Sequence, residues 1–182
     1  MDHDDRGIIA DLKQENKKNL AFHTLVNKYQ ERLYWHIRKI VMDHEDADDV
    51  LQNTFIKVWK SIDKFREESS LYTWLYRIAT NESISFLNSN KRRSFMPLNN
   101  LSEYLVKNLE SDPYFEGDEI QLKLQEAIVR LPEKQRIVFN MKYFDEMKYE
   151  DMSKILDTSV GALKASYFHA TKKIEEYLKN TD

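Results

Sequence analysis

The stretch YEDMSKILDTSVGALKASYFHATKKI, residues 149–174, decides how this chain is interpreted. Its apolar residues recur every three or four positions in two runs, which predicts two amphipathic helices joined by a tight turn. Asp157, Thr158 and Ser159 supply turn chemistry, and Ser159 is a candidate N-cap. A short helix pair of this kind with a basic outer face fits the major groove of DNA. Four lysines create that basic face: Lys154, Lys164, Lys172 and Lys173.

Composition predicts an almost entirely helical protein. The 182 residues are 41% hydrophobic, which is enough for real cores, and include only 3 Gly and 3 Pro to interrupt helices. The absence of cysteine excludes disulfides and thiolate metal sites. We find neither a signal-peptide pattern at the start nor an apolar run of the ~18 residues that a membrane span needs. We therefore expect a soluble protein of the cytoplasm.

The charge distribution divides the chain into three parts. The net charge is −3, and residues 94–118 concentrate the deficit because they hold five carboxylates and one lysine. Both flanking parts are close to neutral, so bulk DNA should be bound weakly and a partner is needed to hold the protein on a promoter. We expect domains at residues 1–93 and 119–182 and a flexible linker at residues 94–118.

Apolar periodicity places the helices within these parts. The fold class that we expect is all-α, with a helical bundle followed by a helix-turn-helix domain. A short helix within the linker is expected at residues 101–109. The longer amphipathic helices are expected at residues 20–42, 46–62, 71–87, 120–131 and 133–143, followed by the helix pair.

Carboxylates crowd the start of the helix expected at residues 46–62. One interpretation is a capped surface helix, because negative charge is favoured at a helix N-terminus. Another is an acidic face that is offered to a basic partner. His44, Glu45, Asp48 and Asp49 could also suggest a metal or acid–base site, but no second cluster of ligands accompanies them. We therefore expect neither a metal nor a cofactor.

The segment at residues 65–81 carries side chains suited to nucleic acid. If the apolar face of its helix is buried, Arg77 and Asn81 face solvent, and Arg and Asn are residues that make paired hydrogen bonds with base edges. Phe65 and Tyr72 could frame a pocket for an unstacked base. The alternative is that Phe65 is a core residue and Tyr72 is half-buried, the commoner fate of aromatic side chains.

Three runs in a fixed order carry a family resemblance: DADDVLQNTFIKVW (46–59), FREESSLYTWLYRIATN (65–81) and LPEKQRIVFNMKYFDEMKYEDMSKILDTSVGALKASYFHATKKI (131–174). From about residue 20 to 178 the chain resembles RNA polymerase sigma factors of the sigma-70 family, extracytoplasmic function (ECF) subfamily. The resemblance implies a bacterial transcription initiation factor, not an enzyme. It also implies sigma region two near residues 20–93 and region four near 119–180.

The resemblance also implies roles for particular residues. Asp48, Asp49 and Gln52 would dock on core RNA polymerase, whereas Phe55 and Trp59 of the same helix are expected in the core. One flipped base of the −10 promoter element would be captured near Phe65 and Asn81, with Arg77, Lys91, Arg92 and Arg93 holding nearby backbone. The −35 element would be read as duplex at Ser159, Gly161, Lys164, Ala165, Phe168 and His169, and Lys172 extends their basic face.

Departures from the family pattern fall in the helix pair. Asp157 stands where a glycine is usual, and Asp tolerates the left-handed backbone better than most residues. Ser166 and His169 stand where arginines are frequent. We therefore expect base recognition by close backbone approach and apolar contact with thymine methyl groups. An alternative role for Phe168 is contact with a domain or a partner.

The resemblance implies core RNA polymerase and promoter DNA as partners, together with an anti-sigma factor that is often anchored in the membrane, and no small-molecule substrate. Two rival classes remain open. One is a helix-turn-helix regulator that acts without polymerase, and the other is a helical adaptor with no nucleic-acid role. A hydrolytic enzyme ranks last, since neither a nucleophile–base pair nor a phosphate loop is found. In the free chain, the linker would allow the two domains to fold against each other.

Overall fold

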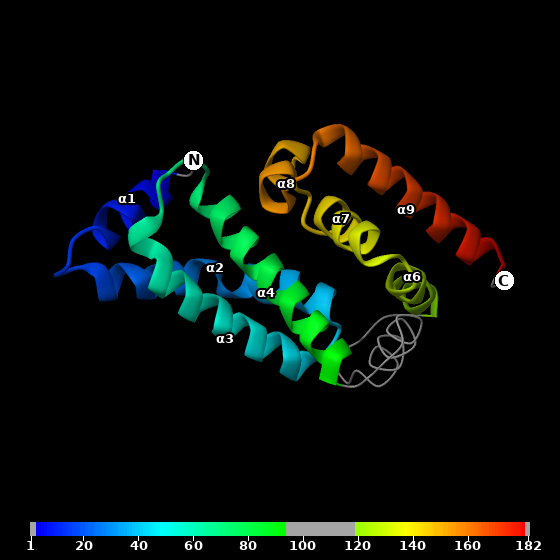
Figure 1. The fold of residues 1–182 in the computed structure, drawn as a ribbon, viewed down its shortest axis with the longest axis horizontal. Helices are drawn as coiled ribbons and strands as arrows, with labels where there is room; N and C mark the ends of the chain where they lie inside the picture. The colour runs from blue at the N-terminus through cyan, green and yellow to red at the C-terminus, as the bar shows by residue number, and fades with distance from the viewer. Residues whose placement is uncertain (1–2, 94–118, 181–182) are drawn as a thin grey trace.

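The computed structural model describes residues 3–93 and 119–180, and all regular structure in these ranges is helical (Figure 1). The expected all-α fold is confirmed, and the expected linker and its short helix lie outside the described residues. None of the described helices is long and apolar enough to cross a membrane. The helices are α1 (His3–Leu12), α2 (Lys18–Val41), α3 (His44–Ser61), the 3-10 turn η1 (Ile62–Lys64), α4 (Leu71–Arg93), α6 (Glu119–Val129), α7 (Glu133–Tyr143), α8 (Tyr149–Leu156) and α9 (Val160–Asn180).

Residues 3–93, here the N-terminal half, form a bundle in which α2, α3 and α4 pack against one another. Helix α1, which the sequence analysis did not predict, covers part of α2 and buries Ile8, Ile9 and Leu12. The Asp5 carboxylate anchors α1 because it accepts hydrogen bonds from Tyr29 Oη at 2.8 Å and from Lys28 Nζ at 3.0 Å. This helix is held by tertiary contacts, since ten residues are too few for a stable isolated helix.

Residues 119–180, here the C-terminal half, contain the expected helix-turn-helix. Met152 of α8 and Leu163 of α9 are buried, as their spacing predicted. At the turn, Asp157 adopts the left-handed conformation (φ 49°, ψ 50°) and its N–H donates to Ser153 O. Ser159 Oγ accepts from the Ala162 N–H at 3.3 Å, which confirms Ser159 as the N-cap of α9. Helices α6 and α7 pack against α9 and fix its orientation.

The two halves are packed together rather than held apart by the linker. Figure 1 shows α1–α4 grouped in one half and α6–α9 in the other, with α8 near the start of α4. Helix α8 packs against α4, and α7 packs against α2. One apolar core continues through this boundary, because Leu71 and Leu75 belong to the same buried cluster as Met152 and Ile155. A second, smaller cluster lies among α6, α7 and α9.

The left-handed residue Asp157 gives a stability prediction. Glycine adopts this backbone at no steric cost, whereas alanine lacks a polar side chain that favours it. Asp157→Gly should therefore leave the protein at least as stable as the parent, and Asp157→Ala should lower the free energy of unfolding by about 1 kcal/mol relative to Asp157→Gly. Urea unfolding of the three proteins measures the difference. Equal stability of the Gly and Ala variants would contradict the strained turn.

Candidate nucleic-acid interface

The outer side of the helix-turn-helix is open to solvent. Ser159 and Gly161 are exposed at the start of α9, and Lys164, Ala165 and His169 are exposed along it. We call this surface the −35 face, and its full membership is Ser159, Gly161, Lys164, Ala165, Phe168, His169 and Lys172, all of them exposed. The structure therefore brings all seven predicted residues of this site to one accessible region of the second helix and its turn.

Phe168 is the apolar centre of the −35 face. Its side chain is 56% exposed, which is unusual for a large aromatic residue in a helical domain. The His169 ring lies 5.7 Å from the Phe168 ring, and Lys172 Nζ lies 5.9 Å from its centroid. An exposed ring next to a lysine can contact thymine methyl groups while the lysine approaches a phosphate.

A second exposed polar surface lies on α4. Arg77 and Asn81 are both exposed and are separated by one helical turn, so they lie on the same side of α4. Phe65 is nearby but only 8% exposed, because its ring packs 5.0 Å from that of Trp74. Phe65, Arg77 and Asn81 are here called the −10 face. Helix α4 continues through Lys91, Arg92 and Arg93, but the side chains of these three lie outside the described residues.

A cavity of about 520 Å³ lies beside the −10 face. Phe65, Trp74 and Arg77 form its wall in the N-terminal half, and Ser153, Lys154 and Asp157 form its wall in the C-terminal half. Its lining is predominantly cationic, with two carboxylates against these four basic residues: Lys64, Arg66, Arg77 and Lys154. Phe65 lines this cavity but Tyr72, which was expected to frame a pocket with it, lines a different one, and α8 closes one side of the cavity beside Phe65.

The start of α3 confirms the capping interpretation of its carboxylates. Asp43 is the N-cap, since its side chain accepts from the Asp46 N–H at 3.0 Å. Asp48, Asp49 and Gln52 remain exposed on the following turns and are available to a partner. In residues 3–93 and 119–180, no group of three or more His, Asp or Glu could hold a metal ion.

Trp59 adds an aromatic residue to the α3 surface. It was expected in the core but is 37% exposed, with Phe22 packed 4.8 Å from it. Lys18 Nζ lies 5.3 Å from the Trp59 ring centroid. The exposed part of this tryptophan lies on the helix that carries Asp48, Asp49 and Gln52, so α3 offers both acidic and aromatic groups.

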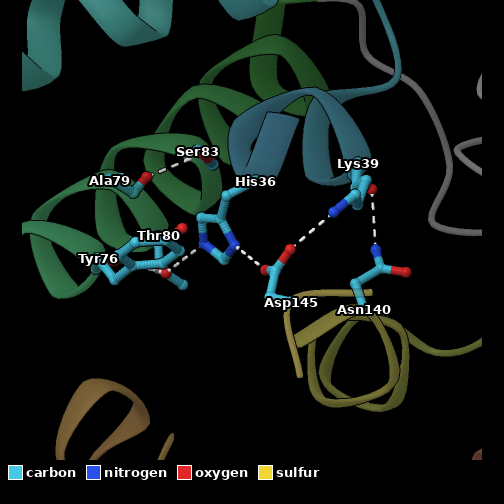
Figure 2. A network of polar contacts seen from close by, with 8 residues as sticks. All are labelled: His36, Lys39, Tyr76, Ala79, Thr80, Ser83, Asn140 and Asp145. Carbon is cyan, nitrogen blue, oxygen red and sulfur yellow. Dashed lines mark hydrogen bonds and ion pairs between the residues drawn. The ribbon is translucent and has the colours of Figure 1, made fainter. Parts of the chain in front are cut away.

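The sequence analysis missed a buried polar contact between the halves. The Asp145 carboxylate accepts from His36 Nδ1 at 2.7 Å and from Lys39 Nζ at 2.6 Å (Figure 2). On the other side of the ring, His36 Nε2 lies 2.9 Å from Thr80 Oγ1. Asn140 Nδ2 also donates to Lys39 O at 3.0 Å. No sequence signal could pair groups that lie more than a hundred positions apart, since neither periodicity nor spacing connects them.

The pKa of Asp145 reflects its buried polar surroundings. Thr80 Oγ1, which donates to Tyr76 O at 2.7 Å, lies 2.9 Å from His36 Nε2. Burial raises the pKa of Asp145, but the hydrogen bond and charge of His36 and the charge of Lys39 outweigh it and hold that pKa below its usual value.

These features define a class of protein: a helical factor with an exposed helix-turn-helix in one half and a polar helix beside a cavity in the other. Comparisons with known proteins agree. The family described as Sigma-70 region 2 matches residues 25–93, and Sigma-70, region 4 matches residues 121–174. The RNA polymerase sigma-H factor of Pseudomonas aeruginosa is 30% identical and the alignment covers 96% of this chain and 94% of that protein.

Further comparisons support the same conclusion. The ECF RNA polymerase sigma-E factor of Haemophilus influenzae is 29% identical over 96% of this chain and 95% of that protein. CnrH, solved in complex with the cytosolic domain of CnrY, has the same fold, with a TM-score of 0.70, 22% identity and coverage of 98% of this chain and 99% of that chain. The chain belongs to the sigma-70 family of RNA polymerase sigma factors, ECF type. Members of this family are transcription initiation factors rather than enzymes.

The acidic start of α3 gives a prediction on pH. Burial, followed by the charges of Asp43, Asp49 and Glu45, raises the pKa of Asp46 from 3.8 to about 6. The folded protein then retains a proton that the unfolded chain releases, so this group lowers the free energy of unfolding as the pH rises from about 4 to 7. Asp46→Asn should remove this slope. Its gain in stability over the parent should be larger at pH 7 than at pH 4.5.

Urea unfolding of both proteins at the two pH values measures that gain, and carboxyl NMR should show Asp46 titrating near pH 6. An equal gain at both pH values would contradict the proposed ionisation.

Proposed function

We propose that this protein directs core RNA polymerase to promoters by reading a −35 duplex with α9 and capturing a flipped −10 base with α4. The observation that carries the proposal is the pair of polar surfaces on separate halves, one on the recognition helix and one beside a cavity with aromatic walls. Neither surface resembles a site for bond chemistry. Together they suit a protein that recognises duplex in one place and opens it in another.

Capture of a −10 base is supported by the chemistry of the cavity. Phe65 and Trp74 supply aromatic walls, and stacking on such groups contributes about 1–3 kcal/mol per base. Extruding a base costs a few kcal/mol, so capture of this strength offsets much of that cost and favours melting. Arg77 lies in the cavity lining, where a guanidinium can hold the phosphate of the extruded nucleotide.

Reading of the −35 duplex is supported by the exposure of the −35 face. Lys164 and Lys172 would approach phosphates, which position the protein without reading sequence. Phe168 and Ala165 offer apolar groups to thymine methyls, and Gly161, which has no Cβ and faces open space, allows the backbone to approach. This face has one exposed aromatic ring and no arginine, so its specificity should depend on shape and methyl contacts.

Docking on polymerase is assigned to α3. Asp48, Asp49 and Gln52 form an exposed acidic and amide surface that can bind a basic helix of the polymerase. The net charge of −3 also fits docking on polymerase through α3. A protein of this charge has weak affinity for bulk DNA, so it needs the polymerase to place it on a promoter.

An anti-sigma factor is the further partner that we propose. CnrH was solved with the cytosolic domain of CnrY, and the sigma factor RpoE with the anti-sigma factor NepR from Bartonella quintana. The RpoE structure resembles this chain with a TM-score of 0.67 and 23% identity. Such a regulator would release this chain in response to a signal. Proteins with a membrane anchor are the place to search for the regulator.

Run-off transcription tests the function. The pure protein is mixed with core RNA polymerase and a library of promoter DNA, and transcripts are sequenced. Defined start sites that require the protein are expected, together with its co-migration with core enzyme. If there were neither transcripts nor co-migration, the chain would not be acting as an initiation factor, and binding of DNA alone would favour a regulator that works without polymerase.

The Asn81 side chain gives a sharper prediction. Asn81→Ala removes a paired donor and acceptor from the −10 face, and one such contact with a base contributes about 1–3 kcal/mol, so open-complex formation should fall roughly 10-fold. Binding to core polymerase should not change, since Asn81 is exposed on α4 and distant in sequence from the α3 surface. Permanganate reactivity of promoter thymines measures opening, and co-migration measures core binding.

The matched control is Asn27→Ala, which truncates another exposed asparagine, on α2, outside both reading faces. It should leave both measurements unchanged. An equal loss of opening and core binding in Asn81→Ala would indicate misfolding and contradict the assigned role.

A further inference from the structure

We propose that α1 and the turn that follows it position Phe65 for the capture of a −10 base, with Lys13 and Lys18 as the positioning residues. This inference rests on the proposed function of the −10 face. It assigns a role to residues 3–18, which lie outside the residues 25–93 that match Sigma-70 region 2. The element that is positioned is the segment at residues 62–70 between α3 and α4, here called the Phe65 loop.

Helix α1 is fixed firmly enough to serve as a support. Its apolar side is buried against the bundle, with Ile8 and Ile9 5% exposed and Leu12 3% exposed. Asp5 is 3% exposed, and its carboxylate accepts a hydrogen bond at 2.8 Å from Tyr29 Oη, which is also buried. A buried hydrogen bond to a carboxylate is strong and directional, so α1 has one favourable position on α2. The turn after α1 is therefore held in one place.

Two ion pairs join this support to the Phe65 loop, one on each side of Phe65. Lys18 Nζ, at the start of α2, lies 2.8 Å from each carboxylate oxygen of Asp63. Lys13 Nζ, just after α1, forms an ion pair with Glu67 Oε1, and Figure 1 shows the segment after α3 beside α1. Asp63 and Glu67 lie two positions before and after Phe65, so the pairs fix both ends of the short segment whose middle residue lines the cavity.

The backbone at Glu67 shows why this end of the segment needs a side-chain anchor. Its φ is 59°, in the left-handed region that residues other than glycine rarely adopt. Such a conformation persists only where the surrounding contacts impose it. In the part of the chain that the structure describes, the pair with Lys13 is the one side-chain hydrogen bond or ion pair made by residues 66–68. Loss of this pair should therefore loosen the segment that carries Phe65.

Lys18 is held from two directions. Its side chain is only 16% exposed, and its Nζ lies 5.3 Å from the ring centroid of Trp59 on α3. The ring limits where the ammonium group can lie, so Asp63 has a partner in a fixed place. A single side chain thus joins the start of α2, the last turns of α3 and the 3-10 turn that leads into Phe65.

Positioning matters here because capture depends on the place and angle of an aromatic ring. A base that enters the cavity must stack on its wall, and stacking requires offset or edge-on geometry within a narrow range of distances. Phe65 forms that wall with its ring 5.0 Å from Trp74. Neither lysine needs to touch the base. Even a weak surface pair can act in this way, because it selects among loop conformations that differ little in free energy.

Charge exchange across the pair of Lys13 and Glu67 tests this role in the full chain bound to core polymerase. Lys13→Glu and Glu67→Lys should each slow promoter opening about threefold, the effect expected of one exposed ion pair, as measured by permanganate reactivity of promoter thymines. The double variant, which reverses both charges, should restore the parental rate. Lys18→Met, which keeps the apolar stem and removes the charge, should slow opening to a similar extent. Binding to core polymerase should be unchanged in every variant.

The matched control is Lys17→Glu. Lys17 Nζ pairs with Asp11 at 3.1 Å, and this ion pair stays within α1 and the turn after it. Its two side chains are 49% and 46% exposed, so it resembles the pair of Lys13 and Glu67 in exposure as well as in charge. The control should open the promoter at the parental rate, which separates positioning of the loop from general repulsion of DNA.

Hydrogen exchange in the free protein gives a second measurement that needs no DNA. The backbone amides of residues 62–70 should exchange about threefold faster in Lys13→Glu and in Glu67→Lys, because the loop opens locally more often. Exchange should return to the parental rate in the double variant and should not change in Lys17→Glu. The amides at the start of α3, residues 44–52, should exchange at one rate throughout.

Several results would overturn the positioning role. They are single variants with unchanged opening or unchanged exchange, a double variant no better than the single ones, and an effect of Lys17→Glu equal to that of Lys13→Glu. The proposed function fails separately. A parent protein that opens no promoter would reject base capture, and the exchange rates would still decide whether α1 holds the Phe65 loop. Normal opening in both single variants would reject positioning alone.

Discussion

A single buried carboxylate sets how the two halves of this protein meet. Asp145 lies in the turn between α7 and α8, and its charge is balanced by His36 and Lys39, more than a hundred positions earlier. Such a charge cannot remain in a poorly hydrated place without its cations, so the turn has one favourable position on α2. That position directs α8 onto α4, where the apolar core of the N-terminal half continues into the C-terminal half. Most of the contact between the two halves is apolar packing, and the polar network fixes how the two halves are aligned.

The two proposed DNA-binding surfaces differ because of this contact. The −35 face lies on a side of the helix-turn-helix that none of the described helices covers, and its residues are exposed. The −10 face lies under α8, with its cavity bounded by both halves. In this ECF-type sigma factor, α8 therefore lies against the proposed −10 face and leaves the proposed −35 face exposed.

Local features of the fold could be predicted from the sequence, and non-local ones could not. Periodicity located α2, α3, α4, α7 and the helix pair, and local rules predicted the left-handed Asp157 and the Ser159 N-cap, because each of these depends on neighbouring residues. Helix α1 was missed because its short apolar run gains stability only against α2, where Asp5 finds Tyr29. Trp59 was assigned to the core because periodicity indicates a face but not how much of a large ring is covered. The Asp145 network joins charges that have no sequence relation.

The site could be predicted to a similar extent. The residues of the −35 face and Asp48, Asp49 and Gln52 were assigned through the family resemblance, and all of them are exposed. Phe65 combines the two interpretations that the sequence left open, since it is mostly buried against Trp74 and also lines the cavity. Small-angle X-ray scattering of the free protein tests the packed arrangement most directly. A packed chain of this length should give a radius of gyration near ~16 Å and one maximum in the pair-distance distribution. A clearly larger radius with a second, long-distance maximum would contradict it.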